Sequence, residues 1–371
     1  MLKVLSIVGT RPEAVKMAPV IRELARRPGR VSSRVCATAQ HREMLDQVLS
    51  VFGVVPDYDL DLMSGARTPA QVASAALARL EPVLERERPD WVLVQGDTTT
   101  VMAATVAAFY AGVRVGHVEA GLRTHDLRQP FPEEGNRRVA GCLADLHFAP
   151  TEGARANLLR ENVPPGRVVV TGNPVVDALR EMSECASAAC DPPALREIPE
   201  GARVVLVTAH RRENFGAPLE AVCGALAELA RRYEGDVRVV YLVHRNPRVW
   251  ETAHRLLAGV RGVTLVPPVD YLTLVRLLKR CHLVLTDSGG LQEEAPCLGK
   301  PVLVLRDKTE RPEAVEAGCV RLVGTDAARI VEEASRLLDC RDCYAQMSRP
   351  TFVYGDGRAA PRIVDALLSY S

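Results

Sequence analysis

The sequence carries almost no net charge, because 47 lysines and arginines stand against 46 aspartates and glutamates. It also has no lysine-rich tail and no basic amphipathic helix, the features by which proteins hold nucleic acids and anionic membrane surfaces. We therefore expect neither a nucleic acid nor a membrane among its partners.

Long apolar runs are missing as well. The first run, residues 4–8, ends at a turn motif, so it is too short for a signal peptide and far too short to span a bilayer. We therefore expect a cytoplasmic protein.

The ten cysteines lack the regular spacing of a disulfide framework, so we expect most of them to be reduced core residues. Cys340 and Cys343 form a lone C-x-x-C near the C-terminus. Because no second ligand pair accompanies them, a zinc or redox role is only a minor alternative.

The signatures of common phosphate, cofactor and metal sites are also absent. The sequence contains no G-x-x-x-x-G-K-[ST] phosphate loop, no H-E-x-x-H and no paired-cysteine metal site. The only G-x-G-x-x-A string, Gly355 to Ala360, lies too close to the C-terminus for the βαβ unit that gives this motif its meaning. We interpret it as the start of a last helix, which disfavours a nicotinamide-dependent oxidoreductase.

What the sequence does contain is a regular alternation of apolar runs and helical patterns. This alternation predicts α/β domains with doubly wound parallel sheets, whose ligands lie outside the carboxyl ends of the strands. The expected strands are residues 4–8, 35–38, 91–94, 113–118, 204–208, 237–243, 263–266, 283–285 and 301–305. The expected helices are residues 12–26, 41–52, 100–111, 218–232, 247–257 and 271–280.

At 371 residues the chain is long enough for two domains, since single cores rarely grow beyond about 250–300 residues. Proline, glycine and alanine loosen the pattern near residues 191–202. We place an N-terminal domain at residues 1–171, a C-terminal nucleotide-binding domain at 172–358, and a last helix at 359–371 that packs back on the N-terminal domain. Both domains begin with a strand, a turn that carries arginine, and a helix. We therefore expect the two domains to face one site.

A glycine turn between two apolar runs is the strongest local signal. The strand at 283–285 leads into Ser288-Gly289-Gly290, and a helical pattern follows. Such a turn leaves backbone N–H groups at the mouth of the crevice, where they suit a phosphate. Glu293 and Glu294 fall in the first helical turn, either as simple helix caps or as acceptors for a ribose diol.

The first strand leads into an arginine-bearing loop. Thr10 and Glu13 form a T-x-x-E capping box and are explained by structure alone. Arg11 is not; its guanidinium suits a diphosphate, with Lys16 about one turn further on, although a solvated arginine is an equal alternative. His210 and Arg211 hold the matching place in the second domain.

Three acids follow expected strands: Asp97, Glu119, and Glu133 or Glu134. Acids weaken a phosphate pocket unless they have another task, and general acid–base chemistry on a sugar is such a task. Taken singly, each is more often a helix cap or a solvated charge. Glu119, directly after an apolar run, is the hardest to explain in that way.

Together these residues are recognisable. Over essentially its full length the chain resembles the bacterial non-hydrolysing UDP-N-acetylglucosamine 2-epimerases. The matching stretches are GTRPEAVKMAP (9–19), TAQHREMLDQVL (38–49), GDTTT (96–100), GHVEAGLRT (116–124), PFPEEGNR (130–137), HRREN (210–214) and DSGGLQEEAPCLGKPVLVLRDKTERPEA (287–314).

The resemblance implies a GT-B-like fold of two Rossmann-like domains, a homodimer and no cofactor. It implies reversible conversion of UDP-GlcNAc to UDP-ManNAc, by expulsion of UDP to give 2-acetamidoglucal and re-addition of UDP after reprotonation at C2. The product supplies ManNAc units for cell-surface polysaccharide. The alternatives are an epimerase of a modified UDP-HexNAc, a hydrolysing epimerase, a GT-B glycosyltransferase, and a nucleotide-sugar sensor without turnover.

The resemblance also assigns roles to residues. The residues that match the family's catalytic positions are Asp97, Glu119, Glu133 and His210. Those that match its substrate contacts are Arg11, Lys16, His210, Ser288, Gly289, Gly290, Glu294 and Arg311. No metal ligand is implied.

Some members are activated by their own substrate at a second site. The positions that match it are Gln40, Glu43, Arg67, Glu134, Arg211 and His244. Glu43 stands where some relatives carry glutamine, and two smaller departures, Ala209 and Gly135, remove no reactive group.

Overall fold

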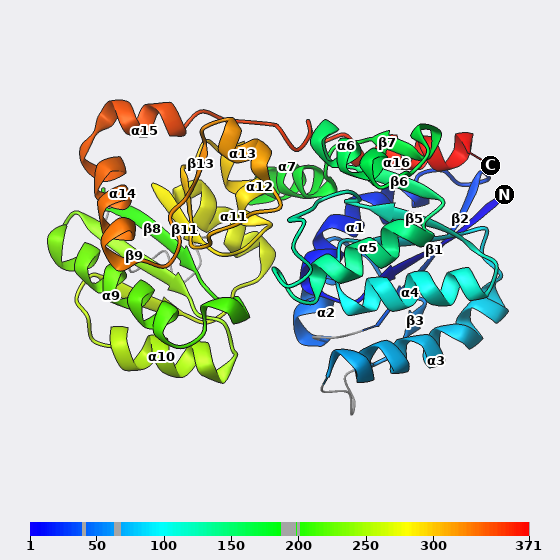
Figure 1. Ribbon diagram of the computed structural model, residues 1–371, viewed down its shortest axis with the longest axis horizontal. Helices are drawn as coiled ribbons and strands as arrows, with labels where there is room; N and C mark the ends of the chain where they lie inside the picture. The colour runs from blue at the N-terminus through cyan, green and yellow to red at the C-terminus, as the bar shows by residue number, and fades with distance from the viewer. Residues whose placement is uncertain (39–41, 63–67, 187–197, 199–200, 371) are drawn as a thin grey trace. The chain divides into compact units, whose positions relative to one another are not determined.

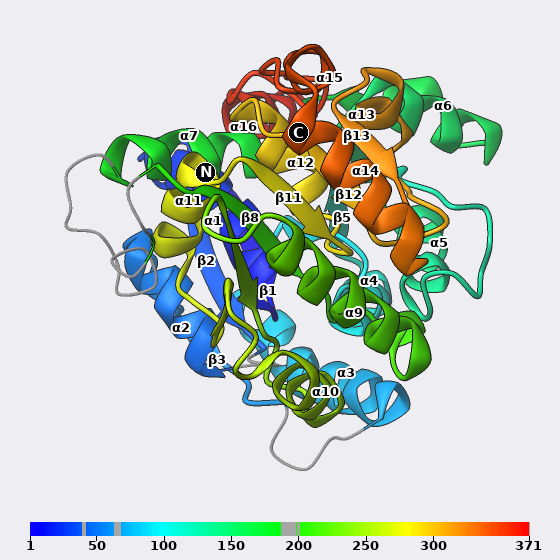
Figure 2. The ribbon, with the colours of Figure 1, turned by 90° about the vertical axis from the view of Figure 1, so that its left-hand side faces the viewer.

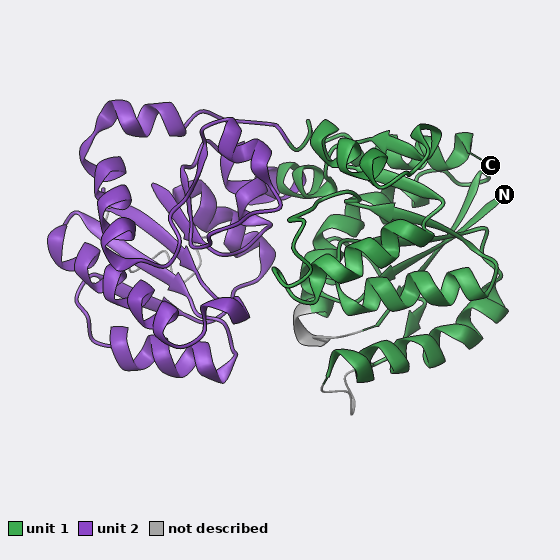
Figure 3. Ribbon diagram, in the orientation of Figure 1, with its two compact units in different colours: residues 1–180, 354–371 green, residues 181–353 purple. Residues whose placement is uncertain are grey.

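A computed structural model describes residues 1–38, 42–62, 68–186, 198 and 201–370. The chain divides into two compact units: unit 1 contains residues 1–180 and 354–371, and unit 2 contains residues 181–353 (Figure 3). The domain boundaries predicted from the sequence fall after residues 171 and 358. The unit boundary at residue 180 falls inside a continuous helix, α7 (Pro174–Ala186).

Unit 1 is built on a parallel sheet of seven strands in the order β3-β2-β1-β4-β5-β6-β7 (Figure 1). The strands are β1 (Leu2–Val8), β2 (Val31–Ala37), β3 (Tyr58–Asp59), β4 (Trp91–Gln95), β5 (Arg114–Val118), β6 (Leu146–Ala149) and β7 (Val168–Val170). The strand order reverses between β1 and β4. Doubly wound folds bind their ligands at such a reversal, beyond the carboxyl ends of the strands.

Helices cover both faces of this sheet. They are α1 (Arg11–Ala25), α2 (Arg42–Val51), α3 (Pro69–Glu87), α4 (Thr99–Tyr110), α5 (Glu133–Leu143), α6 (Glu152–Arg160), α7 and α16 (Ala359–Ser369). Helix α1 packs beside α2 and α16, and α4 packs between α3 and α5. Right-handed crossovers place these two sets on opposite faces, which is why β4 is buried along its whole length.

Unit 2 repeats the plan with a parallel sheet of six strands in the order β10-β9-β8-β11-β12-β13. Strands β8, β11, β12 and β13 of this sheet are labelled in Figure 2. The strands are β8 (Arg203–Thr208), β9 (Val237–Leu242), β10 (Val263–Val266), β11 (Leu283–Thr286), β12 (Val302–Val304) and β13 (Val320–Leu322). The helices are α9 (Ala217–Arg232), α10 (Pro247–Leu257), α11 (Tyr271–Arg280), α12 (Leu291–Cys297), α13 (Pro312–Glu316), α14 (Ala327–Asp339) and α15 (Arg341–Met347). Here the order reverses between β8 and β11.

The predicted fold class, two Rossmann-like doubly wound parallel-sheet domains, is confirmed. The expected turn at residues 288–290 follows β11, and the first βα loop follows β1, so each lies beside the reversal of its own sheet. No helix in the described part of the chain is long and apolar enough to cross a membrane.

The C-terminal segment belongs to unit 1. The glycine string at residues 355–360 opens α16, as predicted, and not a dinucleotide site. The carboxylate of Asp177, on α7, accepts hydrogen bonds from the backbone N–H groups of Ala359 at 3.1 Å and Ala360 at 2.9 Å. Asp177 therefore caps the last helix, which packs on α1.

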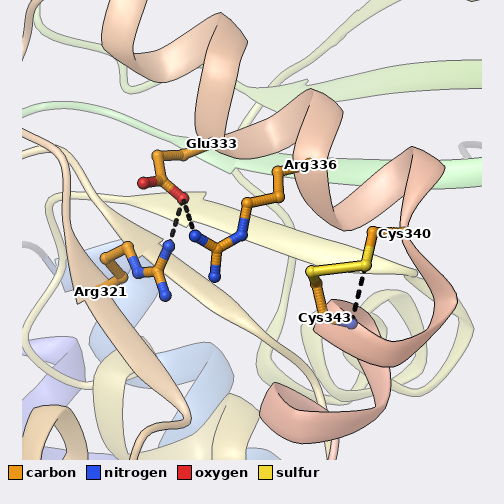
Figure 4. Close-up of a disulfide and its surroundings, with 5 residues drawn as sticks. All are labelled: Arg321, Glu333, Arg336, Cys340 and Cys343. Carbon is orange, nitrogen blue, oxygen red and sulfur yellow. Dashed lines mark hydrogen bonds and ion pairs between the residues drawn. A yellow bond between two sulfur atoms is a disulfide. The ribbon is translucent and has the colours of Figure 1, made fainter.

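Cys340 and Cys343 form a disulfide where α14 meets α15 (Figure 4). The sulfur of Cys340 also accepts the backbone N–H of Cys343 at 3.1 Å and so caps α15. This pair is thus neither a metal site nor a reduced core pair. Of the seven described free cysteines, five are buried, as expected of core residues, and two, Cys142 and Cys185, are exposed.

Candidate functional site

Glu119 follows the end of β5 in an uncommon backbone conformation. Its φ of 64° lies in the left-handed region, which residues other than glycine rarely adopt. Its buried Oε2 pairs with Lys16 Nζ and accepts a hydrogen bond from Asn173 Nδ2 at 2.7 Å. The fold thus holds a carboxyl group and an amino group in contact away from water.

Asp97 follows β4 in a loop that other residues fix from several sides. Arg137 Nε donates to Asp97 Oδ2 at 2.9 Å, and Asn136 Nδ2 donates to the Asp97 carbonyl oxygen at 2.9 Å. His117 Nε2 lies 2.8 Å from the carbonyl oxygen of Gly96. Burial lowers the pKa of His117 to about 4, so the ring is neutral and Nε2–H donates.

The two acids belong to one edge of the sheet. A Cβ on Gly96 would stand 4.0 Å from Glu119 Oε1, so the carboxylate of Glu119 lies next to the loop that carries Asp97. Loops after β4, β5 and β7 supply Asp97, Glu119 and Asn173, all beyond the carboxyl ends of the strands.

Glu133 and Glu134 open α5 and differ in burial. Glu133 is half-buried, whereas Glu134 is fully buried. Glu134 Oε2 accepts hydrogen bonds from Arg137 Nη1 at 2.9 Å and from the backbone N–H of Thr124 at 3.1 Å. Arg137 therefore bridges Glu134 and Asp97, a structural link that the sequence did not reveal.

The first βα loop is built around Glu13. The predicted capping box is confirmed, since Thr10 Oγ1 accepts the N–H of Glu13 and Glu13 Oε2 accepts the N–H of Thr10 at 3.3 Å. The same oxygen accepts the N–H of Gly9 at 2.5 Å. Burial raises the pKa of Glu13 to about 7, although these bonds oppose the shift. Arg11, the first residue of α1, is half-buried beside this loop.

In unit 2 a buried carboxylate, that of Asp287, organises the corresponding loops. Asp287 Oδ2 accepts hydrogen bonds from the backbone N–H groups of His210 at 2.7 Å and Arg211 at 2.8 Å. It also accepts a bond from Asn214 Nδ2 at 3.1 Å. Asp287 thereby holds the loop after β8 against the turn after β11.

The turn Ser288-Gly289-Gly290 is only partly available to a ligand. The N–H of Ser288 points inward and donates to Thr286 Oγ1 at 2.9 Å. Among the described residues, no group accepts from the N–H of Gly289 or Gly290. A Cβ on Gly289 would lie 2.6 Å from Arg311 Nη1, so a side chain there would have to displace the guanidinium.

Glu293 and Glu294, adjacent in sequence, have different partners. Glu293 is fully buried and pairs with Arg311 Nε, so it supports that arginine. Glu294 Oε1 accepts a hydrogen bond from the hydroxyl of Tyr271 at 2.7 Å. Arg311 also pairs with Glu310, whose Oε2 lies 3.0 Å from Arg306 Nη1, so the substrate contact expected at Arg311 belongs to a buried ionic network.

The expected activating site can be followed only in part. Gln40 and Arg67 lie outside the described residues, as does the side chain of Glu43. Of the other three, Glu134 is the buried partner of Arg137, and Arg211 Nε donates to the Asp287 carbonyl oxygen at 3.2 Å. The ring of His244 stacks on that of His210 at 5.3 Å. Substrate activation stays a prediction.

Sequence reasoning missed four residues that hold these groups in place: Asn173, Arg137, Asp287 and Asn214. Their positions after strands or inside recognised motifs were the available signal. Among the described residues, no cluster of three histidines, cysteines or acids could hold a metal ion.

Comparisons with known proteins agree with this arrangement. The family model described as UDP-N-acetylglucosamine 2-epimerase matches residues 22–368. The UDP-N-acetylglucosamine 2-epimerase of Escherichia coli O157:H7 is 52% identical over 374 residues, covering 99% of this chain and 98% of that protein.

Solved structures give the same result. The Neisseria meningitidis UDP-GlcNAc 2-epimerase bound to UDP-GlcNAc has a TM-score of 0.95 at 46% identity, covering 99% of this chain and 100% of that one. The Methanocaldococcus jannaschii enzyme in complex with UDP-GlcNAc and UDP has a TM-score of 0.88 at 32% identity, with full coverage of both chains (100%). The chain therefore belongs to the UDP-N-acetylglucosamine 2-epimerase family.

Proposed function

We propose that this enzyme interconverts UDP-GlcNAc and UDP-ManNAc without net hydrolysis, by elimination of UDP and re-addition to a 2-acetamidoglucal intermediate. Two observations support the proposal. The chain matches relatives named UDP-N-acetylglucosamine 2-epimerase over essentially its full length, and the related Neisseria structure contains UDP-GlcNAc. The polar groups of both units lie beyond the carboxyl ends of the strands, where this fold binds nucleotides.

The chemistry requires an acid–base pair and a site for the leaving group. The C2 hydrogen has no adjacent carbonyl, so simple enolisation is closed. In the elimination a base takes the C2 proton, the C1–C2 double bond forms, and the C1–O electron pair leaves with UDP. In the return step C2 receives a proton on the other face and UDP re-forms the bond at C1.

Glu119 carries this proposal. A buried carboxylate next to a buried lysine amine, held by Asn173, is a group whose proton can be exchanged where water has little access. Asp97, fixed by Arg137, and Glu133 are the further acids in the same unit. We assign proton transfer at C2 to these three, without distributing the steps among them.

The residues of unit 2 suit a diphosphate. His210, the N–H groups of Gly289 and Gly290, and Arg311 are donors, and donors stabilise UDP most at the moment when it leaves with its charge. Arg11 and Lys16 are further candidate cationic contacts in unit 1. Glu294, with its bond to Tyr271, is the candidate acceptor for the ribose diol.

Proton NMR of the enzyme with UDP-GlcNAc in D2O tests the proposal, because elimination breaks the C2–H bond. We expect deuterium at C2 and the anomeric signal of UDP-ManNAc. Free ManNAc would identify a hydrolysing enzyme instead. Absence of exchange would exclude this substrate and favour a modified UDP-HexNAc or a glycosyltransferase.

We also propose that the enzyme is a homodimer that supplies ManNAc units for polysaccharide synthesis. Three exposed apolar side chains on neighbouring helices support the dimer. Phe109 and Tyr110 at the end of α4 are 55% and 79% exposed, and Val139 on α5 is 40% exposed. Exposed apolar side chains on neighbouring helices are a common feature of association surfaces.

A further inference from the structure

The two oxygens of the buried Asp287 carboxylate have different surroundings. Oδ2 accepts the three hydrogen bonds from the loop at residues 210–214. Oδ1 is buried too, yet in the described part of the chain no group donates a hydrogen bond to it. His210 Nδ1 stands 3.2 Å from this oxygen, close enough to bond but without the alignment of a hydrogen bond.

Only one member of this pair can move easily. Asp287 is fully buried and held by three donors, whereas the side chain of His210 is 38% exposed. The ring of His244 lies nearly parallel to that of His210, at an angle of 11°. His244 is itself held, because its Nδ1 accepts the N–H of Asn246 at 3.0 Å. The imidazole of His210 can therefore turn within the stack while its neighbours stay in place.

We propose that Asp287 is a positioning residue for His210. A turn of the imidazole brings Nδ1–H onto the unpartnered Oδ1, which keeps a proton on Nδ1 and makes Nε2 the nitrogen that meets the substrate. A buried carboxylate oxygen without a donor is unfavourable, so the bond satisfies Asp287 as well as orienting the ring. The inference rests on the proposed role of His210 at the diphosphate of UDP.

This arrangement gives Asp287 a part in the reaction through His210. When the C1–O bond breaks, the electron pair passes to the diphosphate, and the imidazolium donates its Nε2–H to a diphosphate oxygen. The carboxylate of Asp287, bonded to Nδ1–H, stabilises the imidazolium. On re-addition the proton returns to Nε2 as the C1–O bond forms again, so His210 ends as it began.

The Asp287→Asn variant tests the inference, because its amide has only one good orientation. The amide oxygen must take the place of Oδ2 to keep the three donors, which puts the amide N–H2 opposite His210 Nδ1. Two donors then face each other and the ring loses its partner. We expect kcat to fall roughly 100-fold or more, with KM changed less than about threefold.

A double-mutant cycle separates positioning from a merely structural role. In the background of His210→Gln, the Asp287→Asn change should lower kcat by less than about twofold, because Asp287 acts through the imidazole. An equal loss in both backgrounds would overturn the inference. The Asp326→Asn variant is the matched control: it makes the same chemical change at the exposed N-cap of α14 in unit 2, and kcat should stay within about threefold of the wild-type value.

A spectroscopic measurement on the wild-type enzyme keeps the test independent of turnover and of the folding of any variant. With 15N-labelled histidine, the resonance that disappears in His210→Gln identifies His210. At a pH where the ring is neutral, its proton should reside on Nδ1; a proton on Nε2 would overturn the inference. If the enzyme failed to exchange C2–H but carried the proton on Nδ1, the proposed reaction would be wrong and the role of Asp287 would stand.

Discussion

At Glu119 three features meet in one residue: burial, a left-handed backbone and a lysine partner. Each of them is unfavourable or restrictive by itself, because a buried charge needs compensation and a left-handed φ strains a residue with a side chain. Strain of this kind persists where the surrounding structure over-determines the conformation. The direct contacts to Lys16 and Asn173 supply that constraint here.

We predict that Glu119→Gln lowers kcat by about 10²–10⁴-fold and leaves the Kd for UDP within about threefold. The amide has nearly the shape of the carboxylate but cannot exchange the C2 proton. Isothermal titration with UDP and the D2O exchange assay measure the two quantities. Glu152→Gln, a change at a side chain 78% exposed in the same unit, is the control and should alter neither. A loss of UDP affinity as large as the loss of rate would refute the assignment.

The pKa of Glu13 predicts a pH dependence of stability. Its folded pKa, about 7, lies above the ordinary value of 4.5, so between these values the folded state binds one proton more than the unfolded state. The free energy of unfolding therefore receives a contribution that is present below pH 4.5 and is lost as the pH rises through 7. The shift corresponds to about 3 kcal/mol.

Glu13→Gln should remove this contribution to the pH slope, because the amide stays neutral. Urea unfolding of both proteins at several pH values between 5 and 8 measures it. We expect the free energy of unfolding of the variant to rise relative to that of the wild type as the pH rises. The control is Gln71→Glu in the exposed capping box of α3, where we expect no change in the pH dependence of stability over this range. Parallel stability curves for wild type and Glu13→Gln would contradict the prediction.

Some site residues were predictable from the sequence and others were not. Glu119 and the turn at Ser288 follow apolar strands, and position alone makes them candidates. Asn173 and Arg137 act through partners 54 and 40 residues away, and their role depends on which loops the sheet brings together. Local pattern carries no such information, so only the fold reveals them.

Among the elements, those with clear start signals were predicted best. Pro247–Leu257 and Tyr271–Arg280 have the predicted limits, since Asn246 and Asp270 cap them. The sequence pattern predicts no element in residues 58–87, although α3 covers Pro69–Glu87. The two-residue strand β3 has too few residues for a periodic signal, and as the edge strand of its sheet it pairs with β2 alone among the described strands.

The disulfide at the start of α15 is expected to matter for stability and not for turnover. Tyr344 on α15 donates from its hydroxyl to the carbonyl oxygen of His282 at 3.1 Å, at the amino end of β11. The candidate phosphate turn follows the carboxyl end of the same strand. A loop closed by cysteines three apart contributes about 2 kcal/mol.

Reduction should therefore lower the melting temperature by several degrees and leave kcat within about twofold. Alkylation under denaturing conditions, followed by mass spectrometry, should find two more thiols after reduction than before. The Cys340→Ser, Cys343→Ser double variant should be insensitive to reductant, whereas Cys142→Ser, at an exposed free cysteine, should behave as the wild type. Equal thiol counts before and after reduction would show that the bond does not form.

At the scale of the whole molecule, the proposed homodimer can be tested at the exposed end of α4. Replacing Phe109 and Tyr110 with glutamate places charge on the proposed contact, while the adjacent Ala107 and Ala108 stay in the core. We predict a shift from dimer to monomer mass in light scattering. Phe352→Glu, at a side chain 58% exposed in unit 2, should leave the dimer intact. A wild-type monomer would contradict the proposal outright.

The division of the chain has a consequence for biosynthesis. Unit 1 needs residues 354–371 as well as residues 1–180, because Asp177 caps α16 and α16 packs on α1. A ribosome delivers every residue of unit 2 before it delivers that last helix. Although its first strand emerges earliest, unit 1 is the second of the two to be completed, and it must wait through the synthesis of an inserted domain of 173 residues, 181–353, with the face of α1 still uncovered.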